Sequence, residues 1–367
     1  MSEPRRIPFN ALTPGEDRAA LNAAIARVID SGWFILGPEV ERFEAEFAAA
    51  CQGAHAVGVG TGTDAITLIL RGLDIGAGDE VITAPLSAAY SALAVMMAGA
   101  RPVFADIDPE RLTLDPAATE AAITPRTKAI MPVHLYGQAA DLTAFAAIAA
   151  RHRLALVEDC AQAHLATSEG RPIGTIGVAA AFSFYPTKNL GALGDAGAVL
   201  TGDAALAARI KRLRNGGQTT RYHHLEAGAN SRLDEIQAAI LRARLPFLSG
   251  WTARRRALAA TYRAHLAPRG VTVPREFDCG HVYHLFPVLT PHRDAVQRHL
   301  AGSGIETFIH YPVPIPQQPA LAAAAPRDCP VANRACAEVL SLPMYPGLSD
   351  ADAAAVVAAL NAFSPGP

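Results

Sequence analysis

The chain has 367 residues, more than one ordinary domain of about 100 to 200 residues, so we expect two lobes or one large α/β unit with an appended part. Half of the residues are hydrophobic, 18% are charged and 6% are aromatic, which excludes a disordered chain and a disulfide-stabilised scaffold. The formal net charge of −2 offers no basic field for nucleic acid and no polybasic stretch for a membrane surface.

The first predicted elements are two amphipathic helices between residues 14 and 50, where Leu21, Ile25 and Val28 follow at helical spacing. Short apolar runs then alternate with helical patterns, which is typical of βαβ units and a mostly parallel sheet. The runs begin near residues 56, 80, 102, 128 and 154, and the helical patterns cover 63–73, 88–99 and 141–152. Two more runs, near 180 and 197, leave no room for a helix between them, which predicts an antiparallel strand or a hairpin near the sheet edge.

After about residue 245 the pattern changes to an Arg-rich helical stretch, a short strand at 284–289 and helices near 293–302, 331–339 and 350–362. We therefore predict a large domain at residues 1–245 and a smaller C-terminal α/β domain at residues 246–367.

Five cysteines at scattered spacing fit reduced thiols better than a disulfide framework. The N-terminal residues lack the apolar stretch of a signal peptide, and no apolar run approaches the ~20 residues that span a bilayer. These features predict a cytoplasmic protein, and the partners that remain are small molecules or other proteins.

Three motifs carry residues suited to chemistry. GVGTGTDAI at 58–66 is a Gly-rich turn between a predicted strand and a predicted helix, where free N–H groups favour a phosphate, although a plain tight turn fits equally well. VEDCAQAH at 157–164 ends an apolar strand with Asp159 and places Gln162 three residues later, with His164 close behind. Ligands gather at such strand ends in open α/β sheets, but a turn-capping aspartate is the commoner case.

The third motif, SFYPTKNLG at 183–191, contains one of only three lysines in the chain. Lys211 lies in a basic helical run and Lys128 opens a predicted strand, so both favour the surface. Lys188 instead follows a strand, a proline and a threonine, and glycines flank it, so its amine is able to enter a cleft. A lysine in such a loop is more often part of a salt bridge than a nucleophile.

Taken together, the motifs supply a phosphate cradle, a carboxylate for a pyridinium nitrogen, a glutamine for a phenolate, a serine for phosphate and a lysine for an aldehyde. This combination predicts a site for pyridoxal 5'-phosphate (PLP).

Through nearly its whole length the sequence also resembles the DegT/StrS family of PLP-dependent sugar aminotransferases. The resemblance rests on GTGTDAI, AGARPVFADIDPERLTLDP, PVHLYGQAADL, VEDCAQAH, SFYPTKNLGALGDAGAV, GANSRLDEIQAAIL and HYPVPIPQQPA. It implies the aspartate aminotransferase fold, fold type I, with a mixed, mostly parallel seven-stranded sheet and a smaller C-terminal domain.

The resemblance implies that Lys188 is the catalytic lysine and binds the cofactor covalently. It also implies that Asp159 contacts the ring nitrogen and that Gln162 contacts the phenolic oxygen. The implied reaction moves an amino group from L-glutamate to a keto-6-deoxy sugar carried on a nucleotide, and Lys188 transfers the protons.

Further cofactor contacts follow from the same resemblance: Gly62, Thr63 and Ser183 bind the phosphate, and Asn230 reaches the phosphate of the neighbouring subunit. The resemblance therefore implies a homodimer with shared active sites. Substrate contacts are expected from four further residues, although each residue type is also common in structural hydrogen bonds. They are His310, Tyr311, Tyr222 and His223.

The chain departs from the family pattern at three places. Ala88 stands where many relatives carry an aromatic residue that stacks on the cofactor, Pro316 stands where relatives often have histidine, and Ala196 replaces a glycine. The loop around Ala88, together with FYPTKNLGALGD at 184–195 and NGGQTTRYHH at 215–224, resembles the branch that aminates 3-keto sugars on dTDP, which yields a dTDP-3-amino-3,6-dideoxyhexose. Amination of a 4-keto sugar nucleotide is the alternative.

Three rival functions remain at this point. A non-catalytic, regulatory PLP-binding relative is disfavoured by the presence of Lys188. A nicotinamide-dependent oxidoreductase built on GVGTG predicts a protein without a visible chromophore. A zinc enzyme using His134, His152 and His164 lacks the spacing of metal ligands, and we expect no metal.

Overall fold

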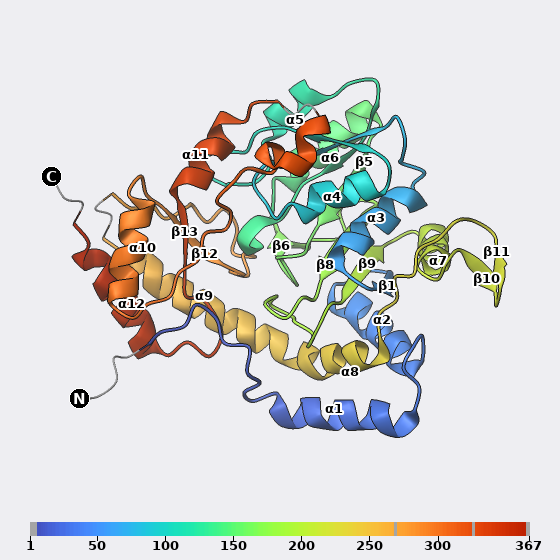
Figure 1. Cartoon of the computed structure of the whole chain (residues 1–367), viewed down its shortest axis with the longest axis horizontal. Helices are drawn as coiled ribbons and strands as arrows, with labels where there is room; N and C mark the ends of the chain where they lie inside the picture. Colours follow the sequence, from blue (N-terminus) through green and yellow to red (C-terminus); the bar gives the residue numbers. More distant parts are fainter. Residues whose placement is uncertain (1–5, 268–269, 325–326, 365–367) are drawn as a thin grey trace.

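The computed structural model describes residues 6–267, 270–324 and 327–364 (Figure 1). The helices are α1 (Arg18–Ser31), α2 (Pro38–Ala50), α3 (Gly62–Gly72), α4 (Tyr90–Met97), α5 (Pro116–Ala122), α6 (Leu142–His152), α7 (Ala204–Leu213), α8 (Glu235–Arg244), α9 (Leu248–His265), α10 (Arg293–Gly302), α11 (Pro330–Glu338) and α12 (Asp350–Ala362). Short 3₁₀ turns are η1 (Leu135–Gly137), η2 (Leu245–Phe247), η3 (Ile315–Gln317) and η4 (Pro319–Ala324).

The strands are β1 (His55–Val59), β2 (Glu80–Thr83), β3 (Arg101–Phe104), β4 (Thr127–Met131), β5 (Ala155–Asp159), β6 (Thr167–Ser168), β7 (Arg171–Pro172), β8 (Ala179–Ser183), β9 (Gly197–Thr201), β10 (Gln218–Thr220), β11 (His223–His224), β12 (Phe286–Leu289) and β13 (Val339–Leu342). Seven of them form the central sheet in the order β1-β9-β8-β5-β4-β2-β3. Only β9 runs against its neighbours β1 and β8, and the other pairs are parallel. The predicted mixed, mostly parallel sheet is confirmed.

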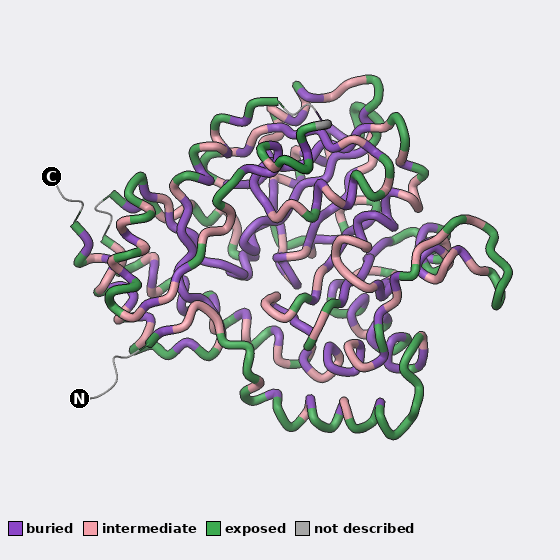
Figure 2. Tube along the Cα trace, in the orientation of Figure 1, coloured by how far each residue is buried: buried purple, intermediate pink, exposed green. Residues whose placement is uncertain are grey.

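Helices cover both faces of this sheet because its strands are apolar on both sides. Along β8, Ala179 and Ala181 point into one core cluster, and Ala180 and Phe182 point into the other. The first cluster contains residues of α3, α4 and α7, and the second contains residues of α2, α6 and α8. Figure 2 shows the buried trace running through the middle of the molecule between exposed outer helices.

The C-terminal part builds a separate small core. There β12 pairs antiparallel with β13, and α9, α10 and α12 pack around them, joined by Ile7 from the N-terminal segment. The proposed domain boundary between residues 245 and 246 falls in η2, between α8 and α9.

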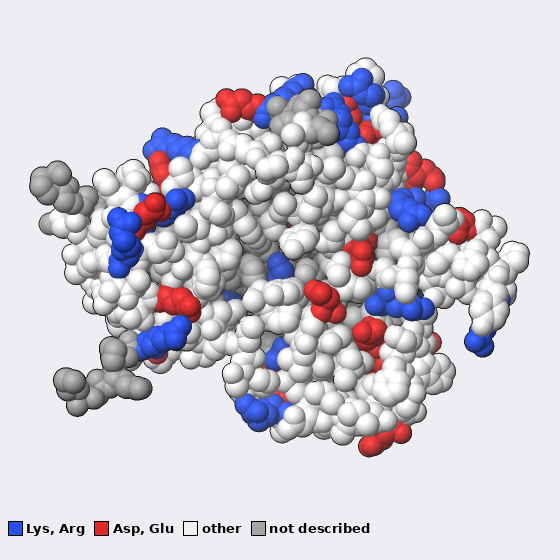
Figure 3. Space-filling model, in the orientation of Figure 1, with Lys and Arg blue, Asp and Glu red and all other residues white. Residues whose placement is uncertain are grey.

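Among the described residues, no helix combines the length and the apolar character needed to cross a bilayer. Figure 3 shows basic and acidic side chains scattered in small groups over the face that it presents.

Candidate active site

Three of the predicted motifs meet at one edge of the central sheet. Asp159 is the last residue of β5, Ser183 is the last residue of β8, and Gly62 opens the helix that follows β1. Because β1, β5 and β8 all run in the same direction, their carboxyl ends lie at the same edge, where ligands bind in open α/β sheets.

The start of α3 and Ser183 are in close contact. A Cβ atom on Gly62 would lie 2.7 Å from the Cβ of Ser183, so only glycine permits this approach. Thr61 caps the helix by accepting a hydrogen bond from the Asp64 N–H at 3.0 Å, and Thr63 lies in the first turn. Free N–H groups at a helix start, next to a serine hydroxyl, form a phosphate-binding set.

Asp159 is a buried carboxylate, 3% exposed, and its side-chain hydrogen bonds within the described part of the chain come from neutral donors. One of its oxygens accepts the Ser91 hydroxyl at 2.7 Å, and the other accepts the Ala161 N–H at 3.1 Å. A buried carboxylate held by neutral donors requires a positive partner. A protonated pyridine nitrogen is such a partner.

Gln162 is buried and already oriented by the protein. Its Oε1 accepts the Tyr136 N–H at 2.8 Å, and its Nε2 donates to the Tyr311 hydroxyl at 2.9 Å. An amide nitrogen carries two N–H groups, so Nε2 has a second one that can donate to a ligand oxygen at this edge. The predicted residue Tyr311 thus lies next to Gln162.

Lys188 lies in the loop that connects β8 to β9, and its N–H donates to the Tyr185 carbonyl at 2.8 Å. Burial lowers the pKa of Lys188 to about 8, and the nearby Asp159 carboxylate opposes part of this effect. The lowered pKa increases the neutral fraction of the amine near pH 7, and only the neutral amine can act as a base or nucleophile.

Two histidines close to Lys188 are held neutral. Burial and the charge of Lys188 lower the pKa of His310 to about 4 and that of His164 to about 3. His310 stacks on Phe9 and interacts with the Ser341 hydroxyl at 3.0 Å. His164 lies against Phe182 and Phe184, and its Nε2 donates to the Ser183 carbonyl at 2.9 Å, so it supports the strand end from behind.

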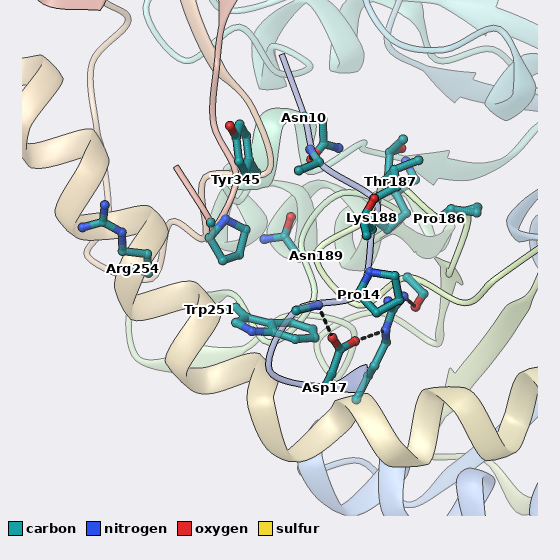
Figure 4. A pocket seen from close by; sticks show the side chains of 18 of the residues that line it. Asn10, Pro14, Asp17, Pro186, Thr187, Lys188, Asn189, Trp251, Arg254 and Tyr345 are labelled. Atoms are coloured by element: carbon teal, nitrogen blue, oxygen red, sulfur yellow. Dashed lines mark hydrogen bonds and ion pairs between the residues drawn. The ribbon is translucent and has the colours of Figure 1, made fainter. Parts of the chain in front are cut away.

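A cavity of about 550 Å³ lies beside the lysine loop. Its walls come from Thr187 to Asn189, from the N-terminal segment at Asn10 to Asp17, and from Trp251 and Arg254 of α9 (Figure 4). Small-molecule sites typically occupy about 300 to 1,000 Å³, and this cavity falls in that range. Its lining includes Lys188 but not Asp159 or Ser183, so it adjoins the lysine loop and is not the edge where the three motifs meet.

Three other predicted residues are not brought into this site within the single chain. Asn230 is exposed, and Tyr222 and His223 lie on the β10–β11 hairpin, which projects from the body (Figure 1). Tyr222 is 80% exposed, and the His223 side chain lies 3.0 Å from the Thr219 hydroxyl on the same hairpin.

The histidines of the rival zinc site do not converge. His152 pairs with Glu120 at the surface, whereas His164 contacts Ser183. His134 lies close to Glu158 and Cys160, but both of its ring nitrogens are already bonded, to the Ala140 N–H and to Glu158. Glu158 also accepts three backbone N–H groups, from residues 174, 176 and 177, so this cluster is a closed structural network.

The GVGTG turn does not support the nicotinamide hypothesis either, because side chains of the protein fill the space beside its first two glycines, where a dinucleotide would approach the backbone. Gly58 is packed against Leu233, and the Gly60 N–H donates to the Ser231 hydroxyl at 3.0 Å. Ser231 in turn donates to Asp64 at 2.8 Å.

Sequence reasoning missed three residues of the site: Ser91, Tyr136 and Ser231. Tyr136 acts through its main-chain N–H and adopts a positive φ of 59°, for which the side chain gives no signal. Ser91 lies in the first turn of α4, directly after the loop with Ala88, and from there its hydroxyl reaches Asp159. The donor set as a whole fits PLP: a helix start and a hydroxyl for the phosphate, a buried acid for the ring nitrogen and an amine for the aldehyde.

Comparison with known proteins gives the same result. The model of the DegT/DnrJ/EryC1/StrS aminotransferase family matches residues 16–361. The chain is 50% identical over 369 residues to dTDP-3-amino-3,4,6-trideoxy-alpha-D-glucose transaminase of Streptomyces venezuelae, covering 99% of this chain and 97% of the relative. It is 46% identical over 344 residues to dTDP-3-amino-3,6-dideoxy-alpha-D-galactopyranose transaminase of Aneurinibacillus thermoaerophilus, covering 94% and 95%.

Among solved structures, the chain is similar to S. venezuelae DesV in complex with a ketimine intermediate. The TM-score is 0.95 at 51% sequence identity, and the match covers 97% of this chain and 98% of DesV. The structural neighbours confirm the predicted fold class.

Proposed function

Because this chain belongs to the DegT/DnrJ/EryC1/StrS aminotransferase family, we propose that it is a PLP-dependent aminotransferase that aminates C3 of a keto-6-deoxy sugar carried on dTDP. The observation that carries this proposal is the meeting of Lys188, Asp159, Ser183 and the start of α3 at one sheet edge. The names of the relatives, which describe 3-amino dTDP sugars, support the position of amination.

When bound, PLP supplies an electron-withdrawing ring that accepts and then delivers the amino group. The protein holds its phosphate with the first N–H groups of α3, at Gly62 and Thr63, and with the Ser183 hydroxyl. Asp159 keeps a proton on the ring nitrogen, and Ser91 fixes the direction of the Asp159 carboxylate. Gln162, oriented by Tyr136, donates its amide to the phenolic oxygen.

Lys188 carries the cofactor and moves the protons. Its lowered pKa lets the Nζ atom take a proton from Cα of the amino donor and return it on the sugar side. His310 and Tyr311 lie near Lys188 and Gln162, respectively. Both side chains are neutral near pH 7, because burial lowers the pKa of His310 to about 4 and raises that of Tyr311 to about 12. They therefore contact the substrate through hydrogen bonds between uncharged groups. L-Glutamate is the proposed amino donor.

The active protein is a homodimer in which each subunit completes the site of the other. Asn230, which is exposed in its own chain, binds the phosphate in the partner's site, and Tyr222 and His223 on the projecting hairpin contact the substrate there. Exposed apolar side chains support an interface: Trp33, Phe34 and Leu225 are 57%, 53% and 63% exposed. The five cysteines are free thiols, which supports a cytoplasmic location.

The test is an absorption spectrum of the purified protein in the near-ultraviolet and visible range. L-Glutamate should convert the band of the bound aldehyde form to that of the amine form, and a dTDP-linked 3-keto-6-deoxy sugar should restore the first band. Restoration by the 4-keto sugar alone would move the amination to C4. No band after added PLP would contradict the whole proposal.

A further inference from the structure

Two chain segments that are far apart in sequence, residues 136–137 and 282–285, are joined by backbone hydrogen bonds. We call this contact the crossing. The Val282 N–H donates to the Gly137 carbonyl at 3.0 Å, and the Leu285 N–H donates to the Tyr136 carbonyl at 3.3 Å. Gly137 has a φ of 98°, and a Cβ there would lie 2.9 Å from the backbone nitrogens of Tyr283 and His284. Glycine therefore permits the two backbones to touch.

Side chains from both sides of the active site are attached to this crossing. On one side the Tyr136 N–H fixes Gln162. On the other side Asn189, which directly follows Lys188, donates from Nδ2 to the Val282 carbonyl at 3.0 Å. Asn189 Oδ1 lies 3.1 Å from His284 Nδ1. Asn189 and His284 are 4% and 6% exposed, so water does not compete for these bonds.

The bond between Asn189 and His284 has a defined direction. Because Nδ2 of Asn189 is used by Val282, its Oδ1 faces His284 as an acceptor, and His284 must carry a proton on Nδ1. Burial lowers the pKa of His284 well below its usual value, and the positive charges of Lys188 and Arg255 lower it further. His164 and His310 also face it. His284 is therefore a neutral donor.

The crossing is in turn tied to the C-terminal part of the chain. Arg255 of α9 donates from one guanidinium nitrogen to the carbonyls of Tyr283, His284 and Met344, at 3.1, 3.3 and 2.8 Å. The segment that holds Asn189 is thus fixed from a helix outside the large sheet.

We propose that Asn189 and His284 form a positioning pair that holds the Lys188 turn against the crossing and so sets the placement of the lysine amine. The proposal rests on the function assigned above to Lys188. The loop is also held on either side of the pair: the Lys188 N–H donates to the carbonyl of Tyr185, which is itself 51% exposed, and Arg244 donates to the Gly191 carbonyl at 2.6 Å. Of these restraints, only the pair acts through the side chain of the residue next to Lys188. A proton-transferring group that moves by about 1 Å loses on the order of 100-fold in rate.

The test uses three substitutions at two neighbouring histidines. His284→Phe keeps the ring and removes the donor, whereas His284→Asn restores a donor on the atom bonded to Cγ, where Nδ1 stood. His281→Phe is the matched control: His281 is 6% exposed, stacks on Tyr283 and accepts the Tyr283 N–H at 3.0 Å, without a hydrogen bond to the lysine loop in the described chain.

The first readout uses the cofactor-free protein and needs no activity. Acetylation of Lys188 by acetic anhydride is followed against pH by peptide mass spectrometry, with Lys128 and Lys211 as internal references. In His284→Phe the apparent pKa of Lys188 should rise from about 8 toward its usual 10.5, because the released turn exposes the amine. His284→Asn should restore the lower value, and His281→Phe should leave it in place.

The second readout is steady-state kinetics of the loaded enzyme. His284→Phe should lower kcat by roughly 10- to 100-fold with little change in the KM of the sugar. Unchanged Lys188 reactivity in His284→Phe, or an equal change in His281→Phe, would overturn the pairing. If His284→Phe does not fold, Asn189→Leu removes both bonds from the other partner and is subject to the same criteria. A wild-type enzyme inactive on every ketosugar would contradict the proposed function alone, because the acetylation readout is independent of turnover.

Discussion

Replacing Gly62 by alanine tests the phosphate cradle directly. The added Cβ would lie 2.7 Å from the Cβ of Ser183, 3.2 Å from its Cα and 3.4 Å from the Phe182 carbonyl. The separation between the start of α3 and the end of β8 must therefore grow by about 0.7 Å before the closest of these contacts becomes an ordinary one at 3.4 Å. Ser183 ends a buried central strand, so the helix start and its N–H groups will absorb most of this shift.

The expected loss of PLP affinity in Gly62→Ala follows from how far phosphate-binding groups can move before binding weakens. Groups that hold a ligand must stay within about 0.5 Å of their productive positions, and a shift of this order weakens binding by roughly 10- to 100-fold. That loss corresponds to about 1.4 to 2.7 kcal/mol of PLP binding free energy. Overpacking also costs about 1 to 3 kcal/mol of folding stability, so a modest fall in Tm accompanies it.

The assay is a titration of the cofactor-free protein with PLP, followed by absorbance or by quenching of tryptophan fluorescence. Gly302→Ala is the matched control, because Gly302 ends α10 with no atom within 4 Å of an added Cβ. The control should bind PLP as the wild type does. A folded Gly62→Ala protein with wild-type affinity would refute the placement of the phosphate between α3 and Ser183.

Three further predictions concern the charged groups and the dimer. Asp159→Asn should retain bound cofactor and lose most of the rate, because an amide cannot keep the ring nitrogen protonated; an unchanged half-reaction with L-glutamate in stopped-flow absorbance would remove Asp159 from this role. In the cofactor-free protein the pKa of Lys188 is about 8 when folded and 10.5 ordinarily, so the unfolded chain binds more protons between these values and stability rises with pH across that window. Urea unfolding should show this rise in the wild type and a smaller one in Lys188→Met; equal slopes would contradict the shift. The inactive variants Lys188→Ala and Asn230→Ala should regain activity when equal amounts are mixed and allowed to reassociate. Half of the dimers are then hybrids, and each hybrid has one intact site of two, so about a quarter of wild-type activity should return. No recovery would exclude shared sites.

Much of the fold was accessible from the sequence because the strands of the central sheet contain short apolar runs, two of which end at the polar residues Asp159 and Ser183. The runs near residues 56, 80, 102, 128 and 154 became β1 to β5, and those near 180 and 197 became the antiparallel pair β8 and β9. Helix ends were less accurate: the pattern at 88–99 became the shorter helix Tyr90–Met97.

The candidate site was accessible only in part. Asp159, Ser183 and Lys188 follow strand ends, so their side chains and positions gave a signal. Contacts between distant segments gave no signal: nothing in the sequence links the Tyr136 N–H to Gln162, or the side chain of Asn189 to that of His284, a residue 95 positions away. Such pairs depend on how two distant backbones cross, and local patterns do not encode the crossing.

The reversed strand β9 explains why the lysine stands where it does. β8 ends at the ligand-binding edge, and β9, which runs in the opposite direction beside it, has to begin at the same edge. The connection at residues 184–196 therefore cannot leave that edge, whereas a parallel continuation would carry the chain to the opposite one. Gly197 completes the closure, because a Cβ there would lie 2.3 Å from the Thr61 carbonyl, which packs the start of β9 against the start of α3. The same short spacing that left no room for a helix thus keeps Lys188 beside the groups that bind the phosphate and the ring nitrogen.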